Sequence, residues 1–179
     1  MATYPVFSVN EVLTADDMNA VGLWLVKTQT VGSAVSTVTV TSAFSSDFDN
    51  YKIIYSGGAG SAAQMDLTFQ LGSTTTNYTY ALIYIIPPSA TINQLSSTSE
   101  TKWPYIGGMT TNGGGIEMEI FSPYLAKYTY MRNTYLRDDV VSATGTGSQK
   151  STTQFTSFTI GTSSGTLTGG TIRVYGYRN

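Results

Sequence analysis

Acidic residues two positions apart are the first place to look for chemistry in this sequence. Glu117 and Glu119 lie in "IEMEIF", where they alternate with apolar residues. Two carboxylates on one face of a strand suit a glycosidase, which needs them about 5–10 Å apart across the scissile bond. The alternation by itself explains both residues as the polar side of a half-buried strand. We therefore favour a structural role for this pair over a catalytic one.

Three other polar or glycine-rich stretches are candidates for a metal or cofactor site. Asp47 and Asp49 in "SDFDN" resemble half of a calcium loop, but the glycine and the later glutamate of such a loop are missing. Asp138 and Asp139 in "LRDDVV" are expected in a hairpin turn. The "GGAGS" stretch is not followed by a lysine or a helical pattern, so no phosphate-binding loop is expected. We predict no metal site and no cofactor, and a cation at the Asp47 and Asp49 pair stays an open alternative.

The composition argues against an enzyme. The 179 residues include no histidine and no cysteine. Histidine is the most common general base and the usual partner of a nucleophilic serine. Without cysteine, disulfides and thiolate metal sites are also excluded. We therefore predict a protein without catalytic residues.

Charge and hydropathy exclude two classes of partner. The formal net charge is −2, and the nine lysines and arginines form no basic run that could follow a phosphate backbone. The longest apolar run, "ALIYII" at 81–86, is too short to span a bilayer, and "MATYPVFSVN" does not resemble a signal peptide. We expect a soluble chain with no nucleic-acid partner and no membrane insertion.

Tyrosine is the abundant residue that could serve in binding, with thirteen in the chain. Tyr78, Tyr80 and Tyr84 share a face of one expected strand, and Tyr128 and Tyr130 share a face of another. Tyrosine suits wet interfaces because it offers a large apolar ring with a polar tip, and the same ring can stack on a sugar. Packing or subunit contact is favoured for these residues, and a glycan-facing role stays open.

Most of the chain has the alternation of β-strands. In "QMDLTFQL", four apolar residues at 65, 67, 69 and 71 point one way and polar residues point the other. Similar patterns recur in "STVTVTSAF", "YKIIYS", "YTYALIYII", "IEMEIF", "AKYTYMRNTYL", "QFTSFTI" and "TIRVYGY", separated by Gly- and Ser-rich turns. Roughly eight to ten short strands at this spacing predict an all-β fold, an antiparallel β-sandwich or jelly-roll-like domain.

Three local features lead to specific expectations. Ile172 and Val174 should face the core, and Gly176 marks a close backbone approach or a bulge. Phe155 and Phe158 are three residues apart, so a bulge is expected to bring them to one face. The Pro-, Ser- and Thr-rich segment 87–104 is expected to be the longest irregular loop.

Residues 1–30 differ from the sandwich domain expected at 31–179. The stretch "VLTADDMNAVGLWL" predicts one short helix at about 14–21, because Thr14 is a suitable N-cap and two aspartates follow in the first turn. Gly22 would end it. From the residues alone, this segment either packs on the adjacent domain or docks on another protein.

Four stretches, in order along the chain, resemble segments of small virion proteins of tailed bacteriophages, especially tail-fibre, minor tail and head-fibre proteins. "FSVNEVLTADDMNA" resembles the F-x-x-G-x-x-LTA-x-x-(L/M)N segment near their start, with Asn10 in place of the usual glycine. "FSSDFDNYKIIYS" is similar to their entry into a sheet strand, and "IFSPYLAKYTYMRN" to two strands joined at a proline turn. "GGTIRVYGYRN" resembles their C-terminal ending.

This resemblance implies a structural protein on the virion, at the tail, the fibre or the capsid surface. It implies an often trimeric β-sandwich that contributes to host attachment, with other phage virion proteins as partners and a host surface glycan as a candidate ligand. Capsid decoration or cement, as in a head-fibre protein, is the alternative, and a carbohydrate-binding module is the second. By the same resemblance, apolar residues near the N-terminus would anchor the chain to the particle: Val12, Leu13, Met18, Leu23 and Trp24.

Overall fold

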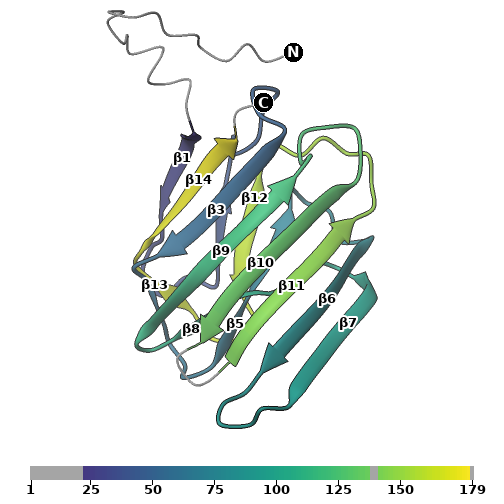
Figure 1. Cartoon of the computed structure of the whole chain (residues 1–179). Coiled ribbons are helices and arrows are strands. Elements are labelled where there is room, and N and C mark those ends of the chain that lie inside the picture. The colour runs from purple at the N-terminus through teal and green to yellow at the C-terminus, as the bar shows by residue number, and fades with distance from the viewer. Residues whose placement is uncertain (1–21, 138–140, 178–179) are drawn as a thin grey trace, which may run out of the picture.

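The computed structural model describes residues 22–137 and 141–177. They form antiparallel strands packed as a sandwich, and none of these residues is helical (Figure 1). The all-β prediction is therefore confirmed. The helix expected at 14–21 lies outside the described residues, as do Val12, Leu13 and Met18. Within the described part of the chain, no helix is long and apolar enough to cross a membrane.

The strands follow one another with short connections. Their bounds are β1 Leu23–Thr30, β2 Thr37–Val40, β3 Asn50–Ser56, β4 Ala59–Gly60, β5 Met65–Leu71, β6 Tyr78–Ile85, β7 Ile92–Glu100, β8 Trp103–Thr110, β9 Gly113–Phe121, β10 Thr129–Arg137, β11 Val141–Gln149, β12 Phe158–Thr162, β13 Leu167–Thr168 and β14 Thr171–Tyr177. The sheet thus begins at Leu23, earlier than the domain boundary expected from the sequence.

A 12-stranded ladder folds back on itself to give two layers. The large sheet has the order β1-β14-β3-β9-β10-β11-β6-β7, and the small sheet has the order β2-β12-β5-β8. The layers join where the end of β8 pairs with the start of β9, while the rest of β9 lies between β3 and β10. Figure 1 shows the small sheet behind the large one, and β4 and β13 form a separate short ladder.

The core lies between the two layers and is rich in aromatic rings. Phe69 on β5 stacks between Phe158 and Trp103, with ring centroids 4.7 Å and 6.0 Å away. The Trp103 indole nitrogen donates a hydrogen bond of 3.1 Å to the carbonyl oxygen of Thr79, so the buried ring keeps its polar group satisfied. Burying such large rings supplies much of the apolar area that holds the layers together.

Alternation correctly predicts the inner side of the last strand. Ile172 and Val174 on β14 are buried. Gly176 lies directly under the ring of Phe48, where an added Cβ would come within 2.3 Å of the ring. The expected close approach at Gly176 is therefore confirmed, and its partner is a phenylalanine side chain.

Two local predictions are wrong. Phe155 and Phe158 are both buried, but β12 begins at Phe158, and Phe155 precedes it in a loop where its N–H donates to the carbonyl oxygen of Pro123. A loop, and not a bulge, therefore turns both rings inward. The segment 87–104 contains β7, which pairs with β6 at the edge of the large sheet. An edge strand exposed on both faces needs no apolar alternation, so its sequence resembles a loop.

Candidate functional site

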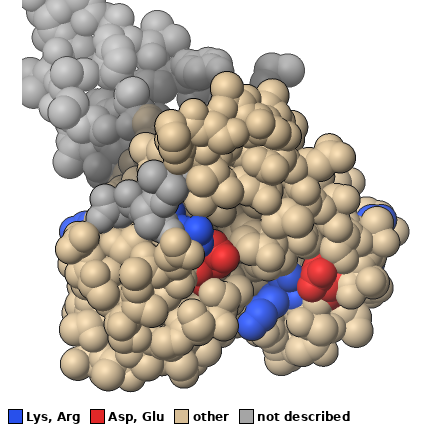
Figure 2. Space-filling view, turned by 90° about the horizontal axis from the view of Figure 1, so that it is seen from below, with Lys and Arg blue, Asp and Glu red and all other residues tan. Residues whose placement is uncertain are grey.

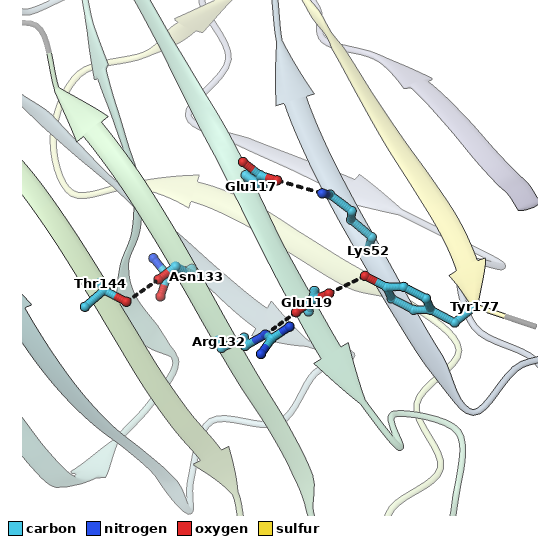
Figure 3. Close-up of polar contacts among 7 residues, drawn as sticks. All are labelled: Lys52, Glu117, Glu119, Arg132, Asn133, Thr144 and Tyr177. Carbon is cyan, nitrogen blue, oxygen red and sulfur yellow. Dashed lines mark hydrogen bonds and ion pairs between the residues drawn. The ribbon is translucent and has the colours of Figure 1, made fainter. Parts of the chain in front are cut away.

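The acidic pair on β9 lies on the outer face of the large sheet, opposite the core (Figure 3). Glu117 forms an ion pair of 2.6 Å with Lys52 on β3. Glu119 binds Arg132 on β10 and also accepts a hydrogen bond from the Tyr177 hydroxyl on β14. A shallow depression of about 460 Å³ lies beside these two ion pairs. The carboxylates therefore connect neighbouring strands through cross-strand pairs of opposite charge.

The pKa shifts in this network fit a structural link between strands. The hydrogen bond from Arg132 holds the pKa of Glu119 below its ordinary value of 4.5, and the Tyr177 hydroxyl contributes. Burial, followed by the bond to Glu119, raises the pKa of Tyr177 to about 12. A general acid needs a carboxyl pKa shifted upward, so the shift at Glu119 runs against that role.

Tyr78, Tyr80 and Tyr84 share the inner face of β6, as their even spacing along the strand predicted. Tyr78 is fully buried, and its hydroxyl accepts a hydrogen bond of 2.9 Å from the N–H of Leu71. The prediction that Tyr78 faces a subunit or a glycan is therefore wrong, because its ring has no exposed surface. Tyr80 and Tyr84 are half-buried, and the Tyr80 ring lies 5.8 Å from that of Tyr105 on β8.

Tyr128 and Tyr130 lie elsewhere, so the structure does not bring the two tyrosine groups together. Both are exposed. Tyr130 is on the outer face of β10, directly across from Phe121 on β9, and Tyr128 precedes the strand. Their role in subunit contact or glycan binding stays a prediction.

Sequence reasoning missed an exposed apolar surface on the outer face, which we call the apolar groove. Ile83 and Ile85 on β6 and Leu136 on β10 line a depression of about 670 Å³, with Ser142 of β11 between them. Leu136 is 74% exposed. Ile92 on β7 lies across from Ile85, is 68% exposed and extends the surface to the edge of the sheet.

A sequence signal for the groove was present in "ALIYII". Both faces of this strand carry apolar side chains: Leu82 and Tyr84 lie on the inner face, and Ile83 and Ile85 lie on the outer one. A strand that is apolar on both faces is normally covered on both faces. Contiguous exposed apolar surface of this kind is typical of interaction sites.

The opposite edge of the large sheet carries a second apolar surface, which we call the β1 patch. It consists of Leu23, Trp24 and Leu25, which are all exposed. β1 pairs with β14 on one side only, so it is an edge strand. Leu23 and Trp24 were predicted to anchor the chain, and their exposure leaves them accessible to a partner.

Charged groups are sparse, and six of them form the ion pairs Lys52–Glu117, Arg132–Glu119 and Arg137–Asp66. Figure 2 shows a surface that is mostly uncharged, with acidic and basic side chains side by side in a few places. Within residues 22–137 and 141–177, no group of three or more acidic, histidine or cysteine residues could hold a metal ion. At the candidate cation pair, the Asp47 carboxylate accepts a hydrogen bond of 2.9 Å from Ser45.

Comparison with known proteins assigns no family. No family model matches the chain, and no curated protein is similar to it. Among solved structures, the chain shows a weak likeness to the VP2 subviral particle of infectious bursal disease virus, at 10% identity and a TM-score of 0.15. The match covers 86% of this chain and 42% of that one. A likeness at this level carries no argument about fold or function.

Exposed apolar side chains thus lie in two places on the large sheet. The apolar groove crosses the outer face as far as β6, and the β1 patch lies on the edge strand β1. The exposed apolar side chains are isoleucine and leucine in the groove and leucine and tryptophan in the patch. Such surfaces gain free energy when another apolar surface removes them from water.

Proposed function

We propose that this chain is a structural protein of a tailed-bacteriophage virion. In this proposal it assembles into a homo-oligomer, a trimer, in the tail or fibre apparatus and contributes to host attachment. The resemblance of four sequence stretches to such proteins supports the virion role. The observation that carries the assembly is the pair of exposed apolar surfaces, the apolar groove on the outer face of the large sheet and the β1 patch at its β1 edge.

The two surfaces favour head-to-tail contact between copies. They differ in sequence and position, so a contact between them is heterologous, and a heterologous contact closes into a ring when the rotation fits. Neighbouring strands of the large sheet are antiparallel throughout, so β1 and β7 run in opposite directions. β1 of one copy could therefore extend the antiparallel ladder beyond β7 of the next.

The chemistry of β7 also supports such a contact. Monomeric proteins protect sheet edges with lysines, prolines or inward charges. β7 has the sequence INQLSSTSE, in which Glu100 is the only charged residue and proline is absent. An edge this long and this neutral is suited to pair with another strand.

Light scattering on the full chain tests the assembly. We expect a trimer, and we expect Leu136→Ser to shift it toward monomer because the substitution places a hydroxyl in the apolar groove. Lys127→Ser is the control, since it removes an exposed side chain outside the groove, just before the same strand. A monomeric wild-type chain, or a trimer broken by the control but not by Leu136→Ser, would contradict the proposal.

The position on the particle separates the two virion roles. Electron microscopy of particles carrying a labelled chain should place it at the tail in the proposed role. A capsid decoration protein would instead cover the shell in many copies. A chain that is absent from particles would contradict both roles and leave a carbohydrate-binding module as the better description.

A further inference from the structure

A second concave site lies where the two sheets meet, on the inner side of the large sheet. It is a pocket of about 210 Å³, which we call the junction pocket. β6 and β10 of the large sheet contribute Tyr84, Tyr135 and Arg137, and β5 and β8 of the small sheet contribute Asp66 and Tyr105. Leucine, isoleucine and valine side chains complete the walls. The pocket thus combines aromatic rings with convergent polar groups, as small-molecule sites commonly do.

An ion pair between the sheets sets the charge of the junction pocket. Arg137 Nη1 lies 2.8 Å from Asp66 Oδ1, and the two side chains are only 13% and 24% exposed. The stem of Arg137 crosses Gly108, where an added Cβ would come within 2.9 Å of it. Because the two charges cancel, neither an anion nor a cation finds an unbalanced charge in this pair.

Three tyrosine hydroxyls add hydrogen-bonding capacity. Tyr135 is 8% exposed, and burial, aided by the charge of Asp66, raises its pKa to about 12, so it stays protonated at neutral pH. Within residues 22–137 and 141–177, no hydrogen bond is described for the hydroxyls of Tyr84, Tyr105 or Tyr135. Tyr84 and Tyr105 are half-buried and line the pocket together with Tyr135. These three hydroxyls are therefore placed to bind a ligand or water.

We infer that the junction pocket binds one pyranose ring of a neutral glycan. Each sugar hydroxyl both donates and accepts hydrogen bonds, and a tyrosine hydroxyl does the same. The C–H faces of the ring can pack against the tyrosine rings and the aliphatic walls. The balanced charge favours a neutral ligand, and the volume suits a single ring. This inference deepens the host-attachment part of the proposed function.

Saturation-transfer difference NMR on the full chain tests this inference. The probes are the methyl glycosides of glucose, galactose, mannose and N-acetylglucosamine, and at least one should show saturable binding. Tyr84→Phe and Tyr105→Phe should each weaken it about tenfold, the effect of losing one hydrogen bond. Tyr175→Phe, which removes a hydroxyl on β14 outside the junction pocket, should leave the affinity unchanged.

Two further probes distinguish other ligand chemistries. Inorganic phosphate, followed by its ³¹P line width, and tetramethylammonium should show no saturable binding. The inference is overturned if none of the four glycosides binds, if both pocket variants bind as the wild type does, or if phosphate or tetramethylammonium binds in their place.

Failure here is distinguishable from failure of the proposed assembly. Tyr105 lines the junction pocket and not the apolar groove, so Tyr105→Phe should leave the oligomeric state unchanged. A trimer that binds no sugar would overturn this inference alone. A monomer that binds sugar would overturn the assembly and retain the pocket.

Discussion

The two halves of the large sheet differ in how far their inner faces are buried. In the covered half, inward side chains of β14, β3 and β9 such as Val174, Ile53 and Met118 are sealed in the main core. In the overhanging half, Leu82 and Tyr135 belong to a separate small cluster, and β7 is exposed on both faces.

The difference arises because the small sheet has fewer strands than the large one. A sheet buries its inner face only where another layer lies against it. Beyond that limit the inner face carries tyrosines and Arg137, which pairs with Asp66 of the small sheet, and the outer face carries the isoleucines of the apolar groove. The covered half contains most of the core, and the overhanging half carries the junction pocket and the exposed isoleucines.

The strongest test of this contrast removes a ring from each half. Phe69→Ala, in the covered half, should lower the free energy of unfolding by about 3–5 kcal/mol, because it opens a cavity between Trp103 and Phe158. Urea titration with fluorescence detection measures the effect. Tyr130→Ala, at an exposed position, is the control and should cost far less. Equal losses would contradict the contrast.

The ion pair at the junction should matter less than the core. Asp66→Asn should cost about 1–3 kcal/mol, because it removes a charged hydrogen bond and leaves the Arg137 charge poorly compensated. Adding Arg137→Met should recover part of this loss. A double-mutant cycle by urea unfolding measures the coupling, and strictly additive effects would show that the pair does not connect the sheets.

The outer-face network predicts a pH dependence. The pKa of Glu119 is below 4.5 in the folded chain, so the folded state binds fewer protons there than the unfolded state. Its contribution, roughly 1 kcal/mol, is present above about pH 5 and is lost as the pH falls through the folded-state pKa. The stability gap between wild type and Glu119→Gln should therefore close as the pH is lowered from 5 through the folded-state pKa in urea unfolding.

A matched variant separates the effect of breaking the Glu119 network from the effect of removing one negative charge. Glu117→Gln also removes a carboxylate from β9, but its side chain is 60% exposed against 19% for Glu119. Its stability gap should be smaller. A gap at Glu119 that does not change with pH would contradict the lowered pKa.

The smallest effect on the protomer is expected in the apolar groove. Ile83→Thr should change the free energy of unfolding of the dissociated chain by less than about 0.5 kcal/mol, because the side chain is exposed. It should nevertheless weaken the proposed oligomer in light scattering at the same concentrations. A large loss of protomer stability would show that the overhanging half is a folding core after all.

Strands with one buried face were predictable from the sequence, and others were not. In β5 and β9 the apolar residues alternate cleanly because one face is in the core and the other carries polar side chains. β7 has no buried face, so nothing in its sequence separated it from a loop. Phe155 is buried from a loop, where no periodicity applies.

The candidate sites show the same limit. Tyrosine parity placed Tyr78, Tyr80 and Tyr84 on one face, but only the position of the small sheet buries Tyr78 and leaves Tyr84 beside a pocket. Asp66 and Arg137 are 71 residues apart and carry no local signal of their pairing. Residue alternation determines which side chains share a face, since it follows from backbone geometry that is local. Which face is covered depends on how far a second layer extends, and only the tertiary structure decides that.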